Sequence, residues 1–227
     1  MRLDIGASRI QLALPESHAL RSGQWVHLGD PEPLSVGEPV SHEQSPHDGY
    51  LSFYYQRGDR LPFADGTFSF AFSEHFFEHL FMDEACELLK ECFRVLRPGA
   101  CFRIAVPDAD LRTYMEPEPV GYSTGDPRWF HPDKHNTRWS IYSLAYALEQ
   151  IGFVTRGVVY CDKYGTYHVH PPDREHEFYA TCLDQEIIQE TRYVSRFLNS
   201  LVVDARKPMD DWHGARTSST PDSRGLA

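Results

Sequence analysis

The sequence predicts an α/β domain in which helices flank a mostly parallel sheet, and two observations support this prediction. Short, largely apolar runs typical of strands recur along the chain, and segments with apolar residues at helical spacing separate them. Strands that alternate with helical crossovers form parallel sheets. A length of 227 residues is enough for one such domain with a substantial core.

The elements follow in chain order from periodicity and turn residues. Arg2 to Ile5 is a strand-like stretch that ends at Gly6-Ala7-Ser8. The clearest helix runs from Met82 to Leu96, where apolar residues recur at helical spacing, and Pro98-Gly99 is expected to end it. Strands are expected at 2–5, 24–28, 51–56, 67–73, 101–106, 153–161 and 200–205, and helices at 10–20, 82–96 and 139–151.

Charge and cysteine content narrow the class of protein. The chain has 22 Lys and Arg against 33 Asp and Glu, a formal charge of −11, and an acidic chain repels phosphate backbones and anionic membranes. Five cysteines without a CxxC pair disfavour both a disulfide framework and a thiolate zinc site. The N-terminus lacks the apolar segment of a signal peptide, and no apolar run is long enough for a membrane helix. We therefore expect a cytoplasmic protein that acts on a small molecule.

Candidate site residues follow the predicted strands. Ligands of parallel sheets bind at the carboxyl ends of the strands, so small and polar residues at those positions are the candidates. A small-residue turn lets a ligand approach the backbone, and carboxylates there can accept hydrogen bonds from a nucleoside. A turn or helix cap is the alternative role of each isolated acid. The candidates are Gly6, Ala7, Ser8, Asp30, Asp59, Ser73, Glu74, His75 and Asp108.

Two sequence blocks carry a family resemblance. RGDRLPFADGTFSFAFSEHFFEHL, followed by ECFRVLRPGACFRIAVPDADL, resembles the class I S-adenosylmethionine-dependent methyltransferases, and LAYALEQIGF and NSLVVDARKP resemble the family's late segments. The resemblance covers residues 1–208 and leaves 209–227 as a polar, flexible tail. It implies a Rossmann-like, seven-stranded, mostly parallel sheet whose last strand is antiparallel. It also implies S-adenosylmethionine as the cofactor.

The resemblance assigns roles residue by residue. Leu3 to Ser8, including Asp4, stands where the family has its glycine-rich cofactor loop, although LDIGASR departs from a G-x-G sequence. Asp30 stands near the ribose-binding acid. Asp59, ahead of Leu61, matches the acid that meets the adenine amine, so Asp59→Ala is expected to weaken cofactor binding. Ser73 to His75 matches the segment beneath the methionine part of the cofactor. Gly99-Ala100 replaces the usual Gly-Gly.

His75, Glu78 and His79 have the spacing of a metal-binding helix face. Positions i, i+3 and i+4 share a face, and the set is similar to the Glu-x-x-Glu-His ligands of metal-dependent methyltransferases. Imidazole and carboxylate suit zinc, iron or nickel. The alternative is a purely structural Glu-His pair, and we predict no metal for this chain. A second histidine group, at 168, 170 and 176, is expected to be a polar loop or part of the acceptor site.

Methyl transfer from a sulfonium is an in-line displacement that depends on positioning and desolvation. A general base is needed only where the acceptor loses a proton, and the candidates are His75, Asp108 and His135. Aromatic residues in the segment expected to cover the site can hold a sulfonium by cation–π attraction or simply pack a lid. These are Tyr114, Tyr122, Trp129 and Trp139.

Three functions remain open from the sequence. The first is a biosynthetic methyltransferase acting on a small molecule. The second is a cyclase or aminocarboxypropyl-type enzyme that consumes S-adenosylmethionine: attack of the α-amine on the γ-carbon closes an azetidine ring and releases methylthioadenosine. The third is a non-catalytic binding protein with a decayed cofactor site. The acidic charge argues against a nucleic-acid methyltransferase. Whether the chain forms a homodimer is left open.

Overall fold

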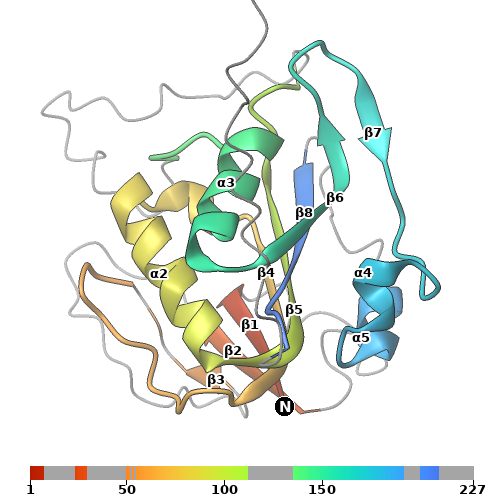
Figure 1. Cartoon of the computed structure of the whole chain (residues 1–227). Coiled ribbons are helices and arrows are strands. Elements are labelled where there is room, and N and C mark those ends of the chain that lie inside the picture. Colours follow the sequence, from red (N-terminus) through yellow and green to blue (C-terminus); the bar gives the residue numbers. More distant parts are fainter. Residues whose placement is uncertain are drawn as a thin grey trace, which may run out of the picture.

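The computed structural model describes residues 1–7, 24–29, 50, 51, 53, 55–111, 135–191 and 200–209. These residues form an eight-stranded sheet in the order β3-β2-β1-β4-β5-β8-β6-β7 (Figure 1). The strands are β1 (Arg2–Ala7), β2 (Trp25–Gly29), β3 (Tyr50–Leu51), β4 (Phe68–Glu74), β5 (Leu96–Pro107), β6 (Val154–Cys161), β7 (Tyr167–Val169) and β8 (Ser200–Arg206). The helices are η1 (Phe77–His79), α2 (Met82–Val95), α3 (Ile141–Ile151), α4 (Glu177–Ala180) and α5 (Gln185–Glu190).

The strand directions match the predicted topology. β3, β2, β1, β4 and β5 pair in parallel, and β8 inserts antiparallel between β5 and β6. The last strand is therefore antiparallel, as predicted. β7 is an unpredicted short addition that pairs antiparallel with the outer side of β6. Chain order reverses between β1 and β4, which makes their carboxyl ends the topological switch point of the sheet.

α2 forms where helical periodicity predicted it, but it ends earlier. Ala85, Leu88 and Leu89 lie on its buried face, and Glu84 Oε2 accepts a hydrogen bond from the Phe81 backbone N–H at 3.0 Å to cap the first turn. The predicted end at Pro98-Gly99 is wrong, because the helix stops at Val95 and β5 already starts at Leu96. Backbone bonds from Gly99 N to Lys207 O and from Lys207 N to Ala100 O hold this segment beside the chain that follows β8.

The predicted third strand at 51–56 is also too long, since β3 ends at Leu51. Phe53 and Tyr55 are each only 4% exposed and pack together in the core. The aromatic run therefore reflects burial rather than a sheet ladder. The predicted helix at 10–20 and the tail 210–227 lie outside the described residues, so those predictions and the boundary at 208 stay untested. None of the described helices is long and apolar enough to span a bilayer.

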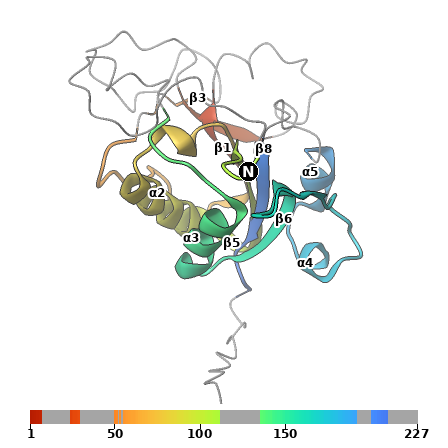
Figure 2. The ribbon, with the colours of Figure 1, turned by 90° about the horizontal axis from the view of Figure 1, so that it is seen from above.

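Helices cover both faces of the sheet (Figure 2). α2 and α3 lie on one face, where their apolar side chains join those of β1, β4 and β5 in the larger core cluster. α4 and α5 lie on the opposite face over Phe70, Phe72 and Cys101. α3 begins at the N-cap Ser140, whose Oγ accepts from Ser143 N, and it ends at Gly152 with φ of 119°. The side chains of β4 and β5 alternate between two apolar layers, which explains why both strands are buried over most of their length.

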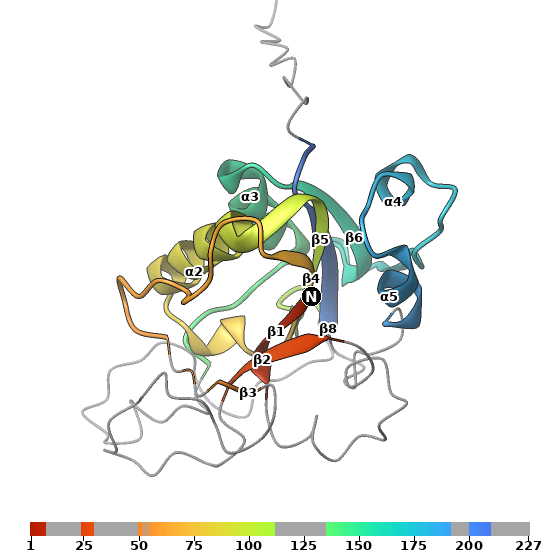
Figure 3. The ribbon, with the colours of Figure 1, turned by 90° about the horizontal axis from the view of Figure 1, so that it is seen from below.

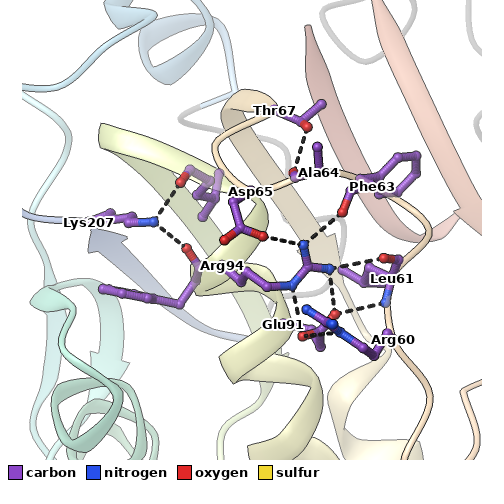
Figure 4. A network of polar contacts seen from close by, with 11 residues as sticks. Arg60, Leu61, Phe63, Ala64, Asp65, Thr67, Glu91, Arg94 and Lys207 are labelled. Carbon is purple, nitrogen blue, oxygen red and sulfur yellow. Dashed lines mark hydrogen bonds and ion pairs between the residues drawn. The ribbon is translucent and has the colours of Figure 1, made fainter.

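Arg94 near the end of α2 fastens the 55–67 segment beneath the helix (Figures 3 and 4). Its guanidinium donates to the backbone oxygens of Leu61 and Phe63 at 3.0 and 2.7 Å, and to the carboxylates of Asp65 and Glu91 at 2.8 and 2.7 Å. Glu91 also accepts from Leu61 N at 2.9 Å. A planar five-donor fork suits this set of acceptors. Arg94 and its partner Glu91 therefore hold the connection into β4.

We expect Arg94→Met to lower the free energy of unfolding at pH 7 by about 2–3 kcal/mol, because charged hydrogen bonds contribute roughly 1.5–3 kcal/mol. The Arg94 hydrogen bond holds the pKa of Glu91 below its ordinary value of 4.5, against an opposing effect of burial. A lowered folded pKa stabilises the protein above the unfolded pKa, and this contribution disappears as pH falls through the folded pKa. The difference in free energy of unfolding between the wild type and Arg94→Met should therefore become smaller below pH 4.5.

Urea unfolding at pH 7 and at about pH 3 measures both quantities. Arg97→Met is the control, since Arg97 makes one exposed 3.3 Å bond to Gly66 O. If Arg94→Met lost the same free energy of unfolding at the two pH values, the proposed contribution of the Arg94–Glu91 interaction would be contradicted.

Candidate functional site

The switch point brings together the ends of β1 and β4. Ile5 of β1 lies opposite Ser73 of β4, and Ala7 lies opposite Gly29 of β2. Gly6 has a φ of +79°, a conformation that side chains disfavour, and a Cβ there would lie 2.4 Å from Phe76 Cβ. Only glycine fits this turn. The predicted pair Gly6-Ala7 therefore lies at the sheet edge where a ligand can reach the backbone.

Ser73 presents a buried hydroxyl at this edge. Its side chain is 0% exposed, and its Oγ has no hydrogen-bond partner among the described residues. A buried polar atom without a partner is costly, and native structures usually give it one. Glu74, the next predicted residue, is 6% exposed. Ser73 Oγ therefore has the properties of an atom that a bound ligand completes.

His75 occupies a left-handed backbone conformation, with φ of +52°, immediately after β4. Its backbone N–H donates to Ala105 O at 2.8 Å, its Nε2 lies 2.8 Å from Ser200 Oγ, and its Nδ1 lies 3.1 Å from Glu78 Oε1. Such conformations persist where the surroundings fix them, and they cluster at functional sites. The predicted site residue His75 is thus held by contacts from three segments.

Asp4 and His27 form a buried pair one strand apart. Asp4 is 1% exposed and its Oδ2 lies 2.9 Å from His27 Nδ1, with the two residues opposite each other in the β1–β2 register. Asp4 was a predicted site residue and His27 was not. The signal for His27 is its polar side chain inside an otherwise apolar strand, WVHLG. The pair fixes β2 against β1 just before the edge.

Asp108 follows β5, as predicted, and is 1% exposed. Burial raises the pKa of its carboxyl. Its Oδ2 accepts from Cys161 N at 2.6 Å, and its Oδ1 accepts from Asp110 N at 3.0 Å. A raised pKa is typical of an acid–base residue. The bond from Cys161 N also joins the end of β6 to the end of β5.

Two other predicted residues lie in different surroundings. Asp59 Oδ2 accepts from Gln56 N at 2.9 Å within a turn, and Leu61 is a core residue, 3% exposed, bonded to Glu91 and Arg94. Contact between Asp59 and an adenine amine stays a prediction. Trp139, a predicted lid residue, is 1% exposed and packs in the larger core cluster. Ser8, Asp30, Tyr114, Tyr122 and Trp129 lie outside the described residues.

A second polar group lies beside His75. The ligand atoms of Glu78, His79 and His135 are all within 4.8 Å of one another. Glu78 and His79 belong to η1, and His135 comes from the segment that precedes α3. The sequence predicted that His75, Glu78 and His79 share one helix face, but only Glu78 and His79 lie in η1, and His75 precedes it in a left-handed conformation. No sequence pattern predicted that His135 joins them. The second histidine group is instead partly on β7, where His168 lies 3.0 Å from Asp162 Oδ2.

All five cysteines lie in described residues, and none of them forms a disulfide: Cys86, Cys92, Cys101, Cys161 and Cys182. The prediction that the chain has no disulfide framework is confirmed. Four of them are buried, and burial raises the pKa of the Cys92 thiol. A buried, protonated thiol is unreactive. The thiols therefore belong to the core.

Comparison with known proteins adds to this geometry. Residues 17–104 match the model of a family described as a methyltransferase domain. No curated protein matches the sequence significantly. Among solved structures, a protein described as a methyltransferase, in complex with the Haloferax volcanii Trm112 methyltransferase activator, is 19% identical, with 91% of this chain and 81% of that chain covered and a TM-score of 0.50.

Two further structures match at similar identity. A SAM-dependent methyltransferase from Methanosarcina mazei is 16% identical, with 92% of each chain covered and a TM-score of 0.49. One from Archaeoglobus fulgidus is also 16% identical, with 91% of this chain and 85% of that chain covered and a TM-score of 0.48. At these identities, structural similarity concerns the fold alone. The family match over residues 17–104 and the observed strand order both support a similarity to the class I S-adenosylmethionine-dependent methyltransferases, whose cofactor is S-adenosylmethionine.

Proposed function

We propose that this protein transfers the methyl group of S-adenosylmethionine to a small-molecule acceptor. The observation that carries the proposal is the unpartnered Ser73 Oγ at the switch point, beside a turn at Gly6 that admits no side chain. A cofactor at this edge supplies the missing hydrogen-bond partner and uses the close approach of the backbone. The residues present therefore fit the cofactor that the family implies.

The chain's own residues act by positioning. When bound, the cofactor supplies an electrophilic methyl group: its S–CH₃ bond breaks as the bond to the acceptor forms. Gly6 lets the backbone reach the cofactor, and Ser73 orients it from below. Much of the rate enhancement in such a displacement comes from holding the two reactants in line and excluding water. The buried carboxyl edge of the sheet suits that task.

A proton acceptor is required only for a protonated acceptor group. Of the three predicted bases, Asp108 has both oxygens occupied by backbone N–H donors. We therefore assign Asp108 to holding β6 against β5, and His75 and His135 remain the candidate bases. Asp59 retains its proposed contact with the adenine amine.

The class of acceptor and the compartment follow from charge and cysteine chemistry. A chain of formal charge −11 disfavours a polyanionic acceptor such as a nucleic acid. Five cysteines that form no disulfide are typical of a reducing compartment. We propose a biosynthetic role in the cytoplasm, with a small molecule as the second substrate.

The test begins with calorimetry of S-adenosylmethionine binding to the purified protein, followed by mass spectrometry of the incubated mixture without an acceptor. Binding with intact cofactor supports a methyltransferase, and a panel of small acceptors then identifies the substrate. Methylthioadenosine formed without any acceptor would overturn methyl transfer and assign the cyclase or aminocarboxypropyl chemistry. Failure to bind, with the fold intact, would assign a decayed site.

The variant Ser73→Ala tests the proposed contact between Ser73 and the cofactor directly. We expect S-adenosylmethionine to bind roughly 3- to 10-fold more weakly, because one net hydrogen bond contributes about 0.5–1.5 kcal/mol. The stability of the free protein should not fall, because the hydroxyl has no partner there. Ser69→Ala is the control from the other end of β4, where Ser69 Oγ donates to Asp184 at 2.8 Å. It should lower stability and leave cofactor affinity unchanged. The opposite pattern would contradict the assigned role of Ser73.

A further inference from the structure

Glu78 is a buried carboxylate that lacks conventional partners. It is 1% exposed, and neither of its oxygens accepts a hydrogen bond from any described residue. The nitrogens nearest to Oε1 are His75 Nδ1 at 3.1 Å and His79 Nε2 at 4.0 Å. An ionised carboxylate removed from water is costly unless a positive charge compensates it. A bound cation would therefore be favourable at this position.

Histidines from two segments converge on this carboxylate. The ligand atoms of Glu78, His79 and His135 lie within 4.8 Å of one another, and the rings of the two histidines are 4.9 Å apart at 76°. Ligands of a tetrahedral ion bonded at about 2.1 Å are separated by roughly 3.4 Å. Small side-chain rotations close that difference. Three donors therefore surround a volume suited to one ion.

The backbone holds the two segments together independently of these side chains. Glu78 O accepts from Asn136 N at 2.7 Å and from Thr137 N at 3.0 Å, and Asn136 Nδ2 donates to His79 O at 2.8 Å. These bonds fix the residue that follows His135 against η1. A site whose ligands come from segments fixed in this way has a low ordering cost on binding.

We propose that Glu78, His79 and His135 bind a divalent transition-metal ion of the zinc type. Two imidazoles and one carboxylate match the ligand preference of Zn²⁺ and neighbouring transition metals rather than Mg²⁺ or Ca²⁺. His75 is placed as the next donor, with Nδ1 facing Glu78 and Nε2 oriented by Ser200 Oγ at 2.8 Å. A bonded second nitrogen is the usual support of a metal-binding histidine. The site thus lies directly beside the cofactor edge at Ser73.

The inference stands apart from the proposed methyl transfer, because metal binding is measured without S-adenosylmethionine. Untagged full-length protein is stripped with a chelator and titrated with ZnCl₂ by calorimetry, with metal content checked by inductively coupled plasma mass spectrometry. We expect one equivalent to bind and to raise the melting temperature. Tetrahedral visible absorption on Co²⁺ substitution would report the nitrogen–oxygen ligand set.

Variants locate the ion. Glu78→Gln and His135→Gln should each bind Zn²⁺ more than about 100-fold more weakly, since even outer-shell partners contribute roughly 10- to 100-fold. His170→Gln, which changes a histidine on the segment after β7, should bind like the wild type. Circular dichroism of the metal-free variants verifies that they fold. If Glu78→Gln fails to fold, the Zn²⁺ affinity of His135→Gln tests the site.

Two results would overturn the inference. One is the absence of stoichiometric Zn²⁺ binding by the stripped protein. The other is equal binding by the wild type, Glu78→Gln and His135→Gln, which would place the ion elsewhere. Either result would show that Glu78, His79 and His135 do not form a metal site.

Discussion

Asp204→Ala is expected to lower the free energy of unfolding by about 3–5 kcal/mol, the usual cost of leaving one member of a buried ion pair alone. Asp204 on β8 is 0% exposed and accepts two 2.7 Å hydrogen bonds from Arg103, the residue opposite it on β5. The variant leaves the Arg103 guanidinium buried, with only Ile188 O and Thr191 Oγ1 as acceptors. The charge then remains without a counter-ion in an apolar layer.

The same carboxylate also accepts from Tyr179 Oη of α4 at 2.8 Å, while Arg103 reaches the end of α5. The network therefore fastens α4 and α5 to the sheet, and we expect these short helices to loosen first in Asp204→Ala. Urea unfolding measures the total loss, and hydrogen exchange locates it.

The control for this experiment is Asp65→Ala. Asp65 also pairs with an arginine, but its side chain is 78% exposed, and exposed pairs contribute only about 0–1 kcal/mol. The double variant Arg103→Met/Asp204→Leu should recover much of the loss, because it removes both charges. A loss below about 1 kcal/mol for Asp204→Ala would show that the pair is not desolvated as the structure indicates.

Gly6→Ala is the second large effect, and it acts on both stability and the proposed cofactor site. An alanine at φ of +79° is strained, and its Cβ would lie 2.4 Å from Phe76 Cβ and 2.6 Å from Phe76 Cγ. A left-handed conformation costs an alanine about 1–2 kcal/mol and overpacking about 1–3 kcal/mol. We expect a total destabilisation of roughly 2–4 kcal/mol and a loss of S-adenosylmethionine affinity of at least about tenfold.

Gly66→Ala is a matched control. Gly66 also has a positive φ, of +63°, but a Cβ there would meet nothing within 4 Å. Gly66→Ala should lose only the free energy that a left-handed alanine costs, and its affinity for S-adenosylmethionine should be unchanged. Thermal unfolding of both variants separates the cost of the strained backbone from the cost of the clash with Phe76. Calorimetry measures the cofactor affinity of each variant. If the two variants lost the same stability and Gly6→Ala kept wild-type affinity, the turn after β1 would not be the cofactor edge.

Several features followed from the sequence alone because they depend on local periodicity. The apolar spacing of 82–95 determined α2 and its buried face, and the apolar runs of β4 and β5 determined strands covered on both sides. Alternation of strands and helices fixed the parallel sheet. Parallel strands in turn place Gly6, Ser73 and His75 at one edge. The odd cysteine count and the lack of a CxxC pair disfavoured a disulfide framework, and the five cysteines form none.

Tertiary structure decided what depends on contacts between distant segments. Bonds from Asn136 and Thr137 to Glu78 and His79 bring His135 beside His79 across more than fifty residues of sequence, and Arg103 meets Asp204 through the β5–β8 register. Local patterns carry no information about such pairings, because register is set by the packing of whole strands. The packing of whole strands also determines that β5 begins at Leu96 and that Trp139 lies in the core. The sequence by itself therefore determined the elements and the edge at which they present polar residues, and only the tertiary structure decided which of those residues meet.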